Sequence, residues 1–489
     1  MIEDELRYRI REALGLVPTD DQEGAIETFC RFLTDRREQT VMVMRGSAGT
    51  GKTTLAAAMV QALLGDDAEH PLMPMVLMAP TGRAAKVFSL YARHEAGTIH
   101  RRIYRQKSLE GGFELNFNMA HDTLFVVDEA SMIGEHNGDG SPVSWPQHSE
   151  NRPLLDDLVS FVYNGRNCRM MLIGDKAQLP PVGEEESPAL TAEVWRQYGL
   201  HVYECDLNEV LRQGQESGIL YNATAIRHIG DGRPHGSAML PKVELRNFED
   251  IRVVPGDELI ESLAGSYSKV GMDETIVVTR SNKRANIYNQ GIRNMVLGRE
   301  EQLCRGDRLM VVKNNYYWTA KENSAIEDGS QMQFIANGDL CVVERVRNVH
   351  ELYGFHFAEV TMTFPDYNDY ELTATVLLDT LTSEAPALTR EQQEELFQRV
   401  MEDYMDIPHK ADRLKKIKED RYFNALQVKF AYAATCHKAQ GGQWAHVYVD
   451  QGYMTDDMLT TDYLHWLYTA FTRATEQLFL VNWPKTQTA

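Results

Sequence analysis

Short apolar runs recur through the first part of the chain, and each ends in a polar or glycine-rich turn followed by helical spacing of apolar residues. The clearest runs are Val41–Met44, Met75–Met78, Leu124–Val127 and Met170–Ile173. Strands that are buried on both faces of a parallel sheet read as continuous apolar runs, because crossover helices cover both faces. The pattern therefore predicts an α/β fold with a parallel sheet, whose ligands would bind beyond the carboxyl ends of its strands.

Two segments interrupt this first α/β unit. Residues 105–121 alternate polar and apolar positions around Gly111-Gly112, which predicts a β-hairpin that projects from the sheet. The segment from Gly134 to Pro153 is rich in Gly, Asn, Ser and Pro, which predicts a mobile surface loop.

A second α/β unit begins near Cys205, with Thr275–Thr279 as an early strand and Asn282–Arg293 as the helix that follows it. Its closing part has further strand-like runs at Val447–Val449 and Leu478–Val481. Two parallel α/β units in one chain allow a ligand site between them, at the carboxyl ends of both sets of strands.

The pattern changes character between the two parts of the second unit. The runs LCVVERVR, FAEVTMTF and ELTATVLLD predict strands of a small antiparallel barrel. Thr389–Met405 then reads as an amphipathic helix that starts with a Thr-Arg-Glu-Gln capping box. The predicted organisation is a first domain at 1–204, a second domain at 205–338 and 428–489, and an inserted barrel subdomain with a helical segment at 339–427.

A glycine-rich segment follows the first strand and matches the pattern G-x-x-x-x-G-K-[ST]. In such a loop the backbone N–H groups face the β-phosphate of a nucleotide, a lysine neutralises the β- and γ-phosphates, and a hydroxyl ligates Mg²⁺. The alternative is a chance glycine-rich turn between a strand and a helix. The predicted ATP-binding residues are Gly46, Ser47, Ala48, Gly49, Thr50, Gly51, Lys52, Thr53 and Thr54, with Thr53 as a metal ligand.

Two later strand ends carry groups that complete such a site. Asp128 ends the third apolar run and would hold Mg²⁺ with Thr53, while Glu129 would orient and deprotonate the attacking water. Gln178 follows the fourth run in LIGDKAQLPPVG, where an amide can contact the γ-phosphate or the water. The structural alternatives are an ordinary strand end or helix cap for the carboxylates and an ordinary loop for Gln178.

Composition and charge indicate the cellular location of the protein more than the reaction it catalyses. The chain has 489 residues, a net charge of −21 and six cysteines without a C-x-x-C pair, so neither a disulfide framework nor a zinc site is predicted. We found no signal peptide pattern and no apolar run of about 18 residues, which predicts a cytoplasmic protein without membrane contact. The acidic total leaves open an enzyme without a nucleic-acid partner, although a narrow channel can bind a strand on an acidic body.

The chemical motifs occur in a characteristic order that resembles superfamily 1 helicases, in particular the RecD, Dda and TraI branch known as superfamily 1B. In order they are GSAGTGKTT, APTGRAA, TIHRRIY, VVDEAS, LIGDKAQLPPVG, LNEVLRQ, ATCHKAQG and LYTAFTRA, within about residues 18 to 480. The resemblance implies two RecA-like P-loop domains, a hairpin in the first and a small SH3-like barrel in the second. It also implies ATP and Mg²⁺, 5′ to 3′ translocation on single-stranded DNA, and unwinding of forked duplexes, with RNA left open as a substrate.

The resemblance assigns further residues to the nucleotide. Gln22 would recognise adenine, Arg212 and Arg473 would be arginine fingers, and Gln440 and Gly441 would meet the nucleotide from the second domain. An arginine suits the finger role because its planar charged fork meets two phosphate oxygens. For Gln22 the alternative is a capped helix start at Thr19, and for Arg212 it is a surface ion pair.

Other residues would contact the DNA strand. The resemblance places Thr81, His100, Thr435 and His437 along the strand path, where hydroxyls and imidazoles can bind phosphates without base selectivity. His100 could instead be a buried histidine that a backbone partner satisfies. An aromatic ring of the hairpin, Phe113 or Phe117, would stack on the last base pair, or alternatively both rings would pack on their own domain. A strand translocase that does not unwind duplexes and a catalytically idle nucleic-acid-binding subunit remain alternative functions.

Overall fold

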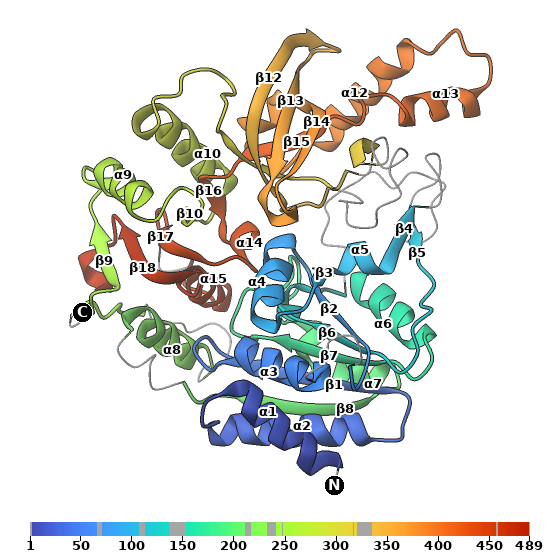
Figure 1. The fold of residues 1–489 in the computed structure, drawn as a ribbon. Coiled ribbons are helices and arrows are strands. Elements are labelled where there is room, and N and C mark those ends of the chain that lie inside the picture. The colour runs from blue at the N-terminus through green and yellow to red at the C-terminus, as the bar shows by residue number, and fades with distance from the viewer. Residues whose placement is uncertain are drawn as a thin grey trace.

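The computed structural model describes residues 2–65, 71–106, 113–135, 153–210, 217–231, 241–246, 248–315, 317–319, 335–455 and 458–488. These residues form two parallel sheets and a closed barrel, with the barrel above the second sheet in Figure 1. No helix within these ranges is both long and apolar enough to cross a membrane.

The first sheet has six parallel strands in the order β3-β2-β6-β7-β1-β8. The strands are β1 (Thr40–Gly46), β2 (Met75–Ala79), β3 (Ala96–Thr98), β6 (Leu124–Val127), β7 (Arg169–Gly174) and β8 (His201–Leu207). The four predicted apolar runs are thus confirmed as β1, β2, β6 and β7. β8 is an edge strand that is mostly exposed or half-buried, so the search for buried apolar runs does not detect it, and it runs across the predicted boundary at residue 204.

Helices cover both faces of this sheet, and neighbouring residues of β1 face opposite cores, as strand geometry requires. Met42 and Met44 lie in the core with the helices of one face, whereas Val41 and Val43 lie in the core of the other. The first face carries α1 (Ile2–Leu14), α2 (Asp20–Thr34), α3 (Lys52–Leu64) and α4 (Gly82–Ala92). The second carries α5 (Ile99–Ile103), α6 (Leu154–Asn164) and α7 (Ala192–Gln197).

The second sheet has five parallel strands in the order β16-β10-β17-β18-β9. They are β9 (Ile251–Val254), β10 (Thr275–Thr279), β16 (Ala433–Thr435), β17 (Trp444–Asp450) and β18 (Ala474–Val481). Its helices are α8 (Gly218–Asp231), α9 (Leu259–Lys269), α10 (Asn282–Gly291), α14 (Cys436–Ala439) and α15 (Thr461–Phe471). The predicted helix 282–293 continues after α10 as a π-helical turn, Ile292–Val296, where the buried Arg293 pairs with Asp307 at 2.9 Å.

The barrel is closed by β11 (Arg308–Val311), β12 (Leu340–Leu352), β13 (Phe355–Phe364), β14 (Tyr370–Leu377) and β15 (Leu426–Phe430). The three predicted strands are β12, β13 and β14, while β11 lies before the predicted subdomain and β15 extends past its end. The pairing is not wholly antiparallel, since β14 and β15 run parallel. A parallel pair needs a crossover connection. The arm of α12 (Arg390–Glu402) and α13 (Lys410–Lys418) supplies it, and the predicted capping box at Thr389 is present.

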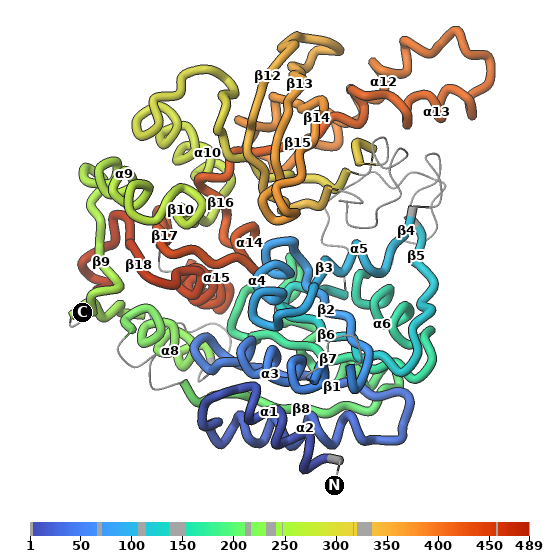
Figure 2. The backbone as a smooth tube through the Cα atoms, in the orientation of Figure 1, coloured from blue at the N-terminus to red at the C-terminus, as the bar shows by residue number. Residues whose placement is uncertain are grey.

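Figure 2 traces the chain from β10 through α10 into the barrel and back through β15 to β16. The barrel interior and one face of the second sheet share a single hydrophobic core. The predicted hairpin is confirmed as the antiparallel pair β4 (Tyr104–Gln106) and β5 (Phe113–Leu115). Its turn, with Gly111-Gly112, and the side chain of Phe113 lie outside the described residues, as do nearly all residues of the predicted 134–153 loop.

Candidate nucleotide site and strand path

The P-loop connects β1 to α3 and depends on glycine at several positions. Gly49 and Gly51 have φ angles of +79° and +74°, a region that residues with a Cβ rarely adopt. A Cβ on Gly46 would lie 2.8 Å from Thr50 Oγ1 and 3.1 Å from the Cβ of Leu207. The loop therefore folds back tightly at the N-terminus of α3, and the first N–H groups of a helix are groups that can bind an anion.

A cavity of about 280 Å³ opens at this loop, between the two α/β units. The first unit contributes Lys52, Thr53, Asp128, Glu129 and Gln178 to its lining, and the second contributes Gly441 and Arg473. These seven predicted site residues thus converge on one cavity from distant segments of the chain.

Asp128 and Glu129 directly follow β6. Asp128 is notable for its burial, and Glu129 for its backbone conformation. Asp128 is 6% exposed and its Oδ1 accepts a hydrogen bond from the N–H of Glu129 at 2.9 Å. Burial, together with the neighbouring Glu129, raises the pKa of Asp128 to about 7, while Lys52 acts in the opposite direction. Glu129 has a φ angle of +52°, and its buried Oε2 has no hydrogen-bond partner among the described residues. Such a strained backbone with an unsatisfied carboxylate is typical of a functional position.

The second unit approaches this site closely through the loop after α14. Gly441 has a φ angle of +77°, and a Cβ there would lie 3.1 Å from Thr81 Oγ1 in the first unit. Its neighbour Gln440 donates from Nε2 to the carbonyl of Leu179 at 2.8 Å and lies 3.5 Å from Gln178 Oε1. Gln440 therefore stands behind Gln178 rather than in the cavity lining, while Gly441 lines the cavity itself.

Arg473 lies between α15 and β18 and is 2% exposed. Its guanidinium donates to the carbonyls of Thr469 and Gly442 at 3.0 and 2.9 Å, and to Thr472 Oγ1 at 3.2 Å. These partners are neutral, so among the described residues no carboxylate within hydrogen-bond distance compensates the charge of Arg473. Arg212 lies outside the described residues.

Gln22 is, like Gln440, a predicted nucleotide contact whose side chain bonds elsewhere in this structure. Its Oε1 accepts from the N–H of Thr19 at 3.1 Å, and its Nε2 donates to the carbonyl of Thr50 at 3.0 Å. The first bond belongs to a capping box at the start of α2, which was the structural alternative for this segment. Gln22 thus supports the P-loop from behind, and its side chain is absent from the cavity lining.

The predicted strand-contacting residues follow the carboxyl ends of β2, β3 and β16. Thr81 caps α4 by accepting from the N–H of Ala84 at 3.2 Å, and Thr435 is the N-cap residue of α14. His100, on α5, is half-buried with its ring 5.5 Å from that of Tyr104, and His437 is exposed. Figure 1 shows α4, α5 and α14 in one band below the barrel. These residues therefore lie along one edge of both sheets.

The hairpin presents an exposed aromatic ring at its base. Phe117 follows β5 and is 63% exposed, and the guanidinium of Arg105 lies 4.9 Å from its ring centroid. Arg105 also pairs with Glu114 at 2.7 Å. The alternative that Phe117 packs into its own domain does not fit this exposure.

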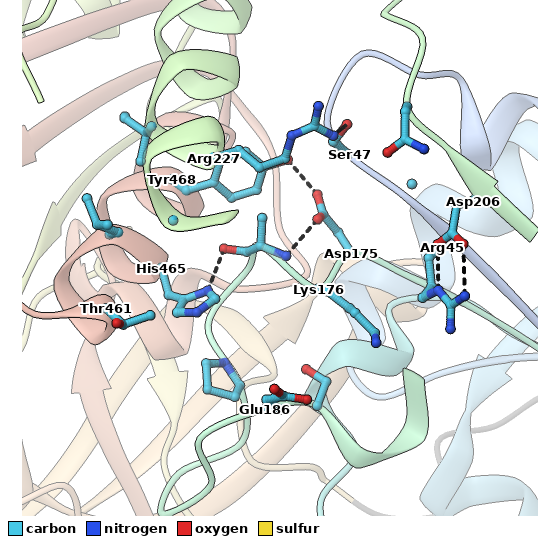
Figure 3. Close-up of a pocket in the computed structure, with 18 of the residues that line it drawn as sticks. Arg45, Ser47, Asp175, Lys176, Glu186, Asp206, Arg227, Thr461, His465 and Tyr468 are labelled. Atoms are coloured by element: carbon cyan, nitrogen blue, oxygen red, sulfur yellow. Dashed lines mark hydrogen bonds and ion pairs between the residues drawn. The ribbon is translucent and has the colours of Figure 1, made fainter. Parts of the chain in front are cut away.

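A second and larger cavity, of about 450 Å³, lies on the other side of the P-loop (Figure 3). It is lined from the first unit by residues that include Arg45, Asp175 and Asp206, and from the second by residues that include Arg227 and Tyr468. None of these five residues has a role predicted from the sequence. Tyr468 lies in the quoted LYTAFTRA motif, and its place five residues before Arg473 in that motif was the available signal.

The fold and the site define the class of protein as a P-loop protein with two RecA-like parallel sheets. Residues 19–139 match the family model described as AAA domain, and residues 430–481 match the UvrD-like helicase C-terminal domain. The resemblance to superfamily 1B helicases, predicted from the order of the motifs, is confirmed by these matches and by two relatives.

The first relative is the ATP-dependent RecD2 DNA helicase of Deinococcus radiodurans, which is 26% identical over 348 residues, 69% of this chain. The second is the ATP-dependent DNA helicase dda of Enterobacteria phage T4, 24% identical over 314 residues, 62% of this chain. The aligned parts span 42% and 62% of the lengths of these relatives. A solved structure of Pif1 helicases at forked double-stranded DNA is 14% identical, covering 97% of this chain and 94% of its own, with a TM-score of 0.47.

Proposed function

We propose that this chain is an ATP-dependent DNA helicase, which translocates on single-stranded DNA and unwinds duplex DNA. The observation that carries the proposal is the cavity into which Lys52, Asp128 and Glu129 project from one sheet unit and Arg473 from the other. A site divided between two units changes its geometry when the units move, so hydrolysis can be coupled to motion. The similarity to RecD2 and Dda, both named as ATP-dependent DNA helicases, supports DNA as the partner.

In this proposal the P-loop N–H groups and Lys52 bind the phosphates of ATP. Thr53 and Asp128 would hold Mg²⁺, because a hydroxyl and a carboxylate are oxygen ligands of the kind that this ion prefers. The Asp128 carboxyl is buried and lies close to Lys52. Bound Mg²⁺ supplies neutralisation of phosphate charge. Glu129 orients a water molecule toward the γ-phosphorus and takes its proton, and the bond from that phosphorus to the bridging oxygen of ADP breaks.

Arg473 would act as an arginine finger in the same reaction. Closure of the cleft would direct its guanidinium from the neutral partners it has here to the oxygens of the γ-phosphate, with Gln178 beside it. Arg212 is proposed as the second finger. Gln22 would reach adenine only by giving up its bond to Thr50, so we assign it to ATP recognition on the resemblance alone.

The strand would lie across Thr81, His100, Thr435 and His437, which come from both units. Opening and closing of the cleft then changes the distance between two grips on the strand, so each ATP hydrolysed yields a step. We propose 5′ to 3′ polarity from the resemblance, and the hairpin with Phe117 as the element that meets the duplex.

The deciding experiment compares unwinding of 5′-tailed and 3′-tailed forked DNA, and of the matching RNA duplexes, with ATP and Mg²⁺. The Lys52→Ala variant serves as the control for contaminating activity. We expect unwinding of the 5′-tailed DNA only. Strand-stimulated ATPase without unwinding would identify a translocase, and binding without ATPase would identify a catalytically idle subunit.

A further inference from the structure

Helix α15 makes a seam of hydrogen bonds with the loop that follows β7 in the other unit. His465 Nδ1 lies 2.9 Å from the carbonyl of Ala177, and Tyr468 donates to Asp175 Oδ2 at 2.6 Å. Thr469 Oγ1 accepts from the N–H of Leu179 at 2.8 Å. Residues three and four positions apart share a helix face, so α15 presents these side chains together, as Figure 3 shows for His465 and Tyr468.

Tyr468 makes a second contact that no other residue of this seam makes. Its hydroxyl accepts a hydrogen bond from the N–H of Ala48, in the P-loop, at 2.8 Å. Tyr468 is 1% exposed and Asp175 is 3% exposed, so both side chains of this chain of two bonds are buried, and successive hydrogen bonds in a buried network strengthen one another. One hydroxyl from the second unit therefore joins two elements of the nucleotide site in the first.

The contact matters because Tyr468 lies close in sequence to Arg473. Arg473 follows Tyr468 by five residues, just beyond the end of α15, and lines the nucleotide cavity. Any displacement of α15 relative to the first unit must therefore move Arg473 and pull on Ala48 and Asp175 together. Gln178, which lines the cavity, lies in the same loop as Asp175.

We propose that Tyr468 is a positioning residue of the ATPase: its hydroxyl fixes the P-loop backbone at Ala48 and the loop at Asp175 relative to the helix that delivers Arg473. This inference rests on the proposed ATPase function. Tyr468 touches neither the phosphates nor the water in this role. It holds the two halves of the site in their relative position, so its loss should lower turnover rather than nucleotide affinity.

The chain offers a matched control on the same helix. Tyr463 is 2% exposed, and its hydroxyl donates to Gln451 Oε1 at 2.8 Å, within the second unit. Tyr463→Phe therefore removes one buried tyrosine hydroxyl from α15 without touching the seam. Tyr468→Phe keeps the ring but leaves the Ala48 N–H and Asp175 Oδ2 without this partner.

The experiment measures kcat and KM for ATP with saturating single-stranded DNA, together with Tm, for wild type, Tyr468→Phe, Tyr463→Phe and Lys52→Ala. We expect Tyr468→Phe to lower kcat about 10- to 100-fold with KM changed less than about threefold, because two hydrogen bonds that align the site are lost. Tyr463→Phe should retain wild-type kcat, and the two Phe variants should have similar Tm values. Equal kcat in the two Phe variants would overturn the proposal.

Two further results distinguish failure of this proposal from failure of the proposed ATPase function and from misfolding of the variant. An inactive wild type, or an active Lys52→Ala, would refute the ATPase function itself. If Tyr468→Phe does not fold, Thr469→Val tests the same seam with an isosteric side chain that lacks the acceptor for the Leu179 N–H. A loss of kcat of about 3- to 10-fold then supports the seam, and an unchanged kcat refutes it.

Discussion

Substitution of Gly441 by alanine tests whether the approach of the two units at this loop matters for turnover. The residue combines a φ angle of +77° with close neighbours in the other unit. A Cβ would lie 3.1 Å from Thr81 Oγ1 and 3.4 Å from both the Cβ of Ala84 and the Sδ of Met132. The added methyl group therefore has two effects, backbone strain within its own loop and a steric contact across the cleft.

The two effects differ in size and in what they perturb. The left-handed conformation costs an alanine about 1–2 kcal/mol wherever the units are. The steric contact is present at the separation of the units seen here and tightens as the cleft closes further, so it adds a penalty to closure. Rotation of the Thr81 hydroxyl would relieve it but would break the cap on α4, at about 1 kcal/mol. A penalty of about 1 kcal/mol on closure corresponds to about a fivefold loss of turnover.

Gly452 provides the control that separates these effects. It has a φ angle of +69°, and a Cβ there would meet no heavy atom of the described residues within 4 Å. Gly452→Ala should therefore lower Tm like Gly441→Ala but leave DNA-stimulated ATPase unchanged. The assay is steady-state ATPase at saturating DNA alongside thermal unfolding. Equal turnover in the two variants would refute the inference that contact at Gly441 controls closure.

Four further results are expected. Glu129→Gln should bind ATP but lose turnover by about 10² or more, since the amide cannot take a proton; unchanged turnover would make Glu129 structural. Arg473→Ala should lower kcat by about 10³–10⁵ with a smaller change in nucleotide binding, and a change confined to affinity would contradict a finger. Strand binding should weaken steeply with salt, as counterions are released from phosphates, and a flat titration would argue against a phosphate-tracking path. Phe117→Ala should spare strand-stimulated ATPase and reduce unwinding, while Met119→Ala, at an 81% exposed position nearby, should affect neither; equal effects of the two would place the wedge elsewhere.

The buried strands and the positions of the polar side chains at their ends could be predicted because both depend on local sequence. A continuous apolar run such as Leu124–Val127 identifies a strand, and the carboxylates after it identify its functional edge. The barrel could be predicted only in part. β11 is a four-residue run without alternation, and its place in the barrel depends on pairing with β12 and β15, far along the chain.

Side-chain partners across the cleft could not be predicted, because they depend on how the two units pack. Gln22 illustrates the limit in one direction, since the motif predicts a contact with adenine and the side chain instead bonds to Thr50. Tyr468 illustrates the opposite case, a contact that the motif does not predict. Nothing in its motif specifies a bond to Ala48, which lies 420 residues earlier in the chain.

The contacts at Gly441 link the proposed strand path to the candidate nucleotide site through very few atoms. Thr81, which belongs to the proposed strand path, is the nearest neighbour of a Cβ built on Gly441, and Gly441 lines the nucleotide cavity. The preceding residue, Gln440, bonds to Leu179, whose own N–H is held by α15. A strand that displaces Thr81 would therefore press on the loop that borders the γ-phosphate position. Closure of the cleft would equally change the space open to the strand. Linkage between two sites requires reciprocal coupling of this kind. Here the coupling would pass through a single contact, between Thr81 and Gly441.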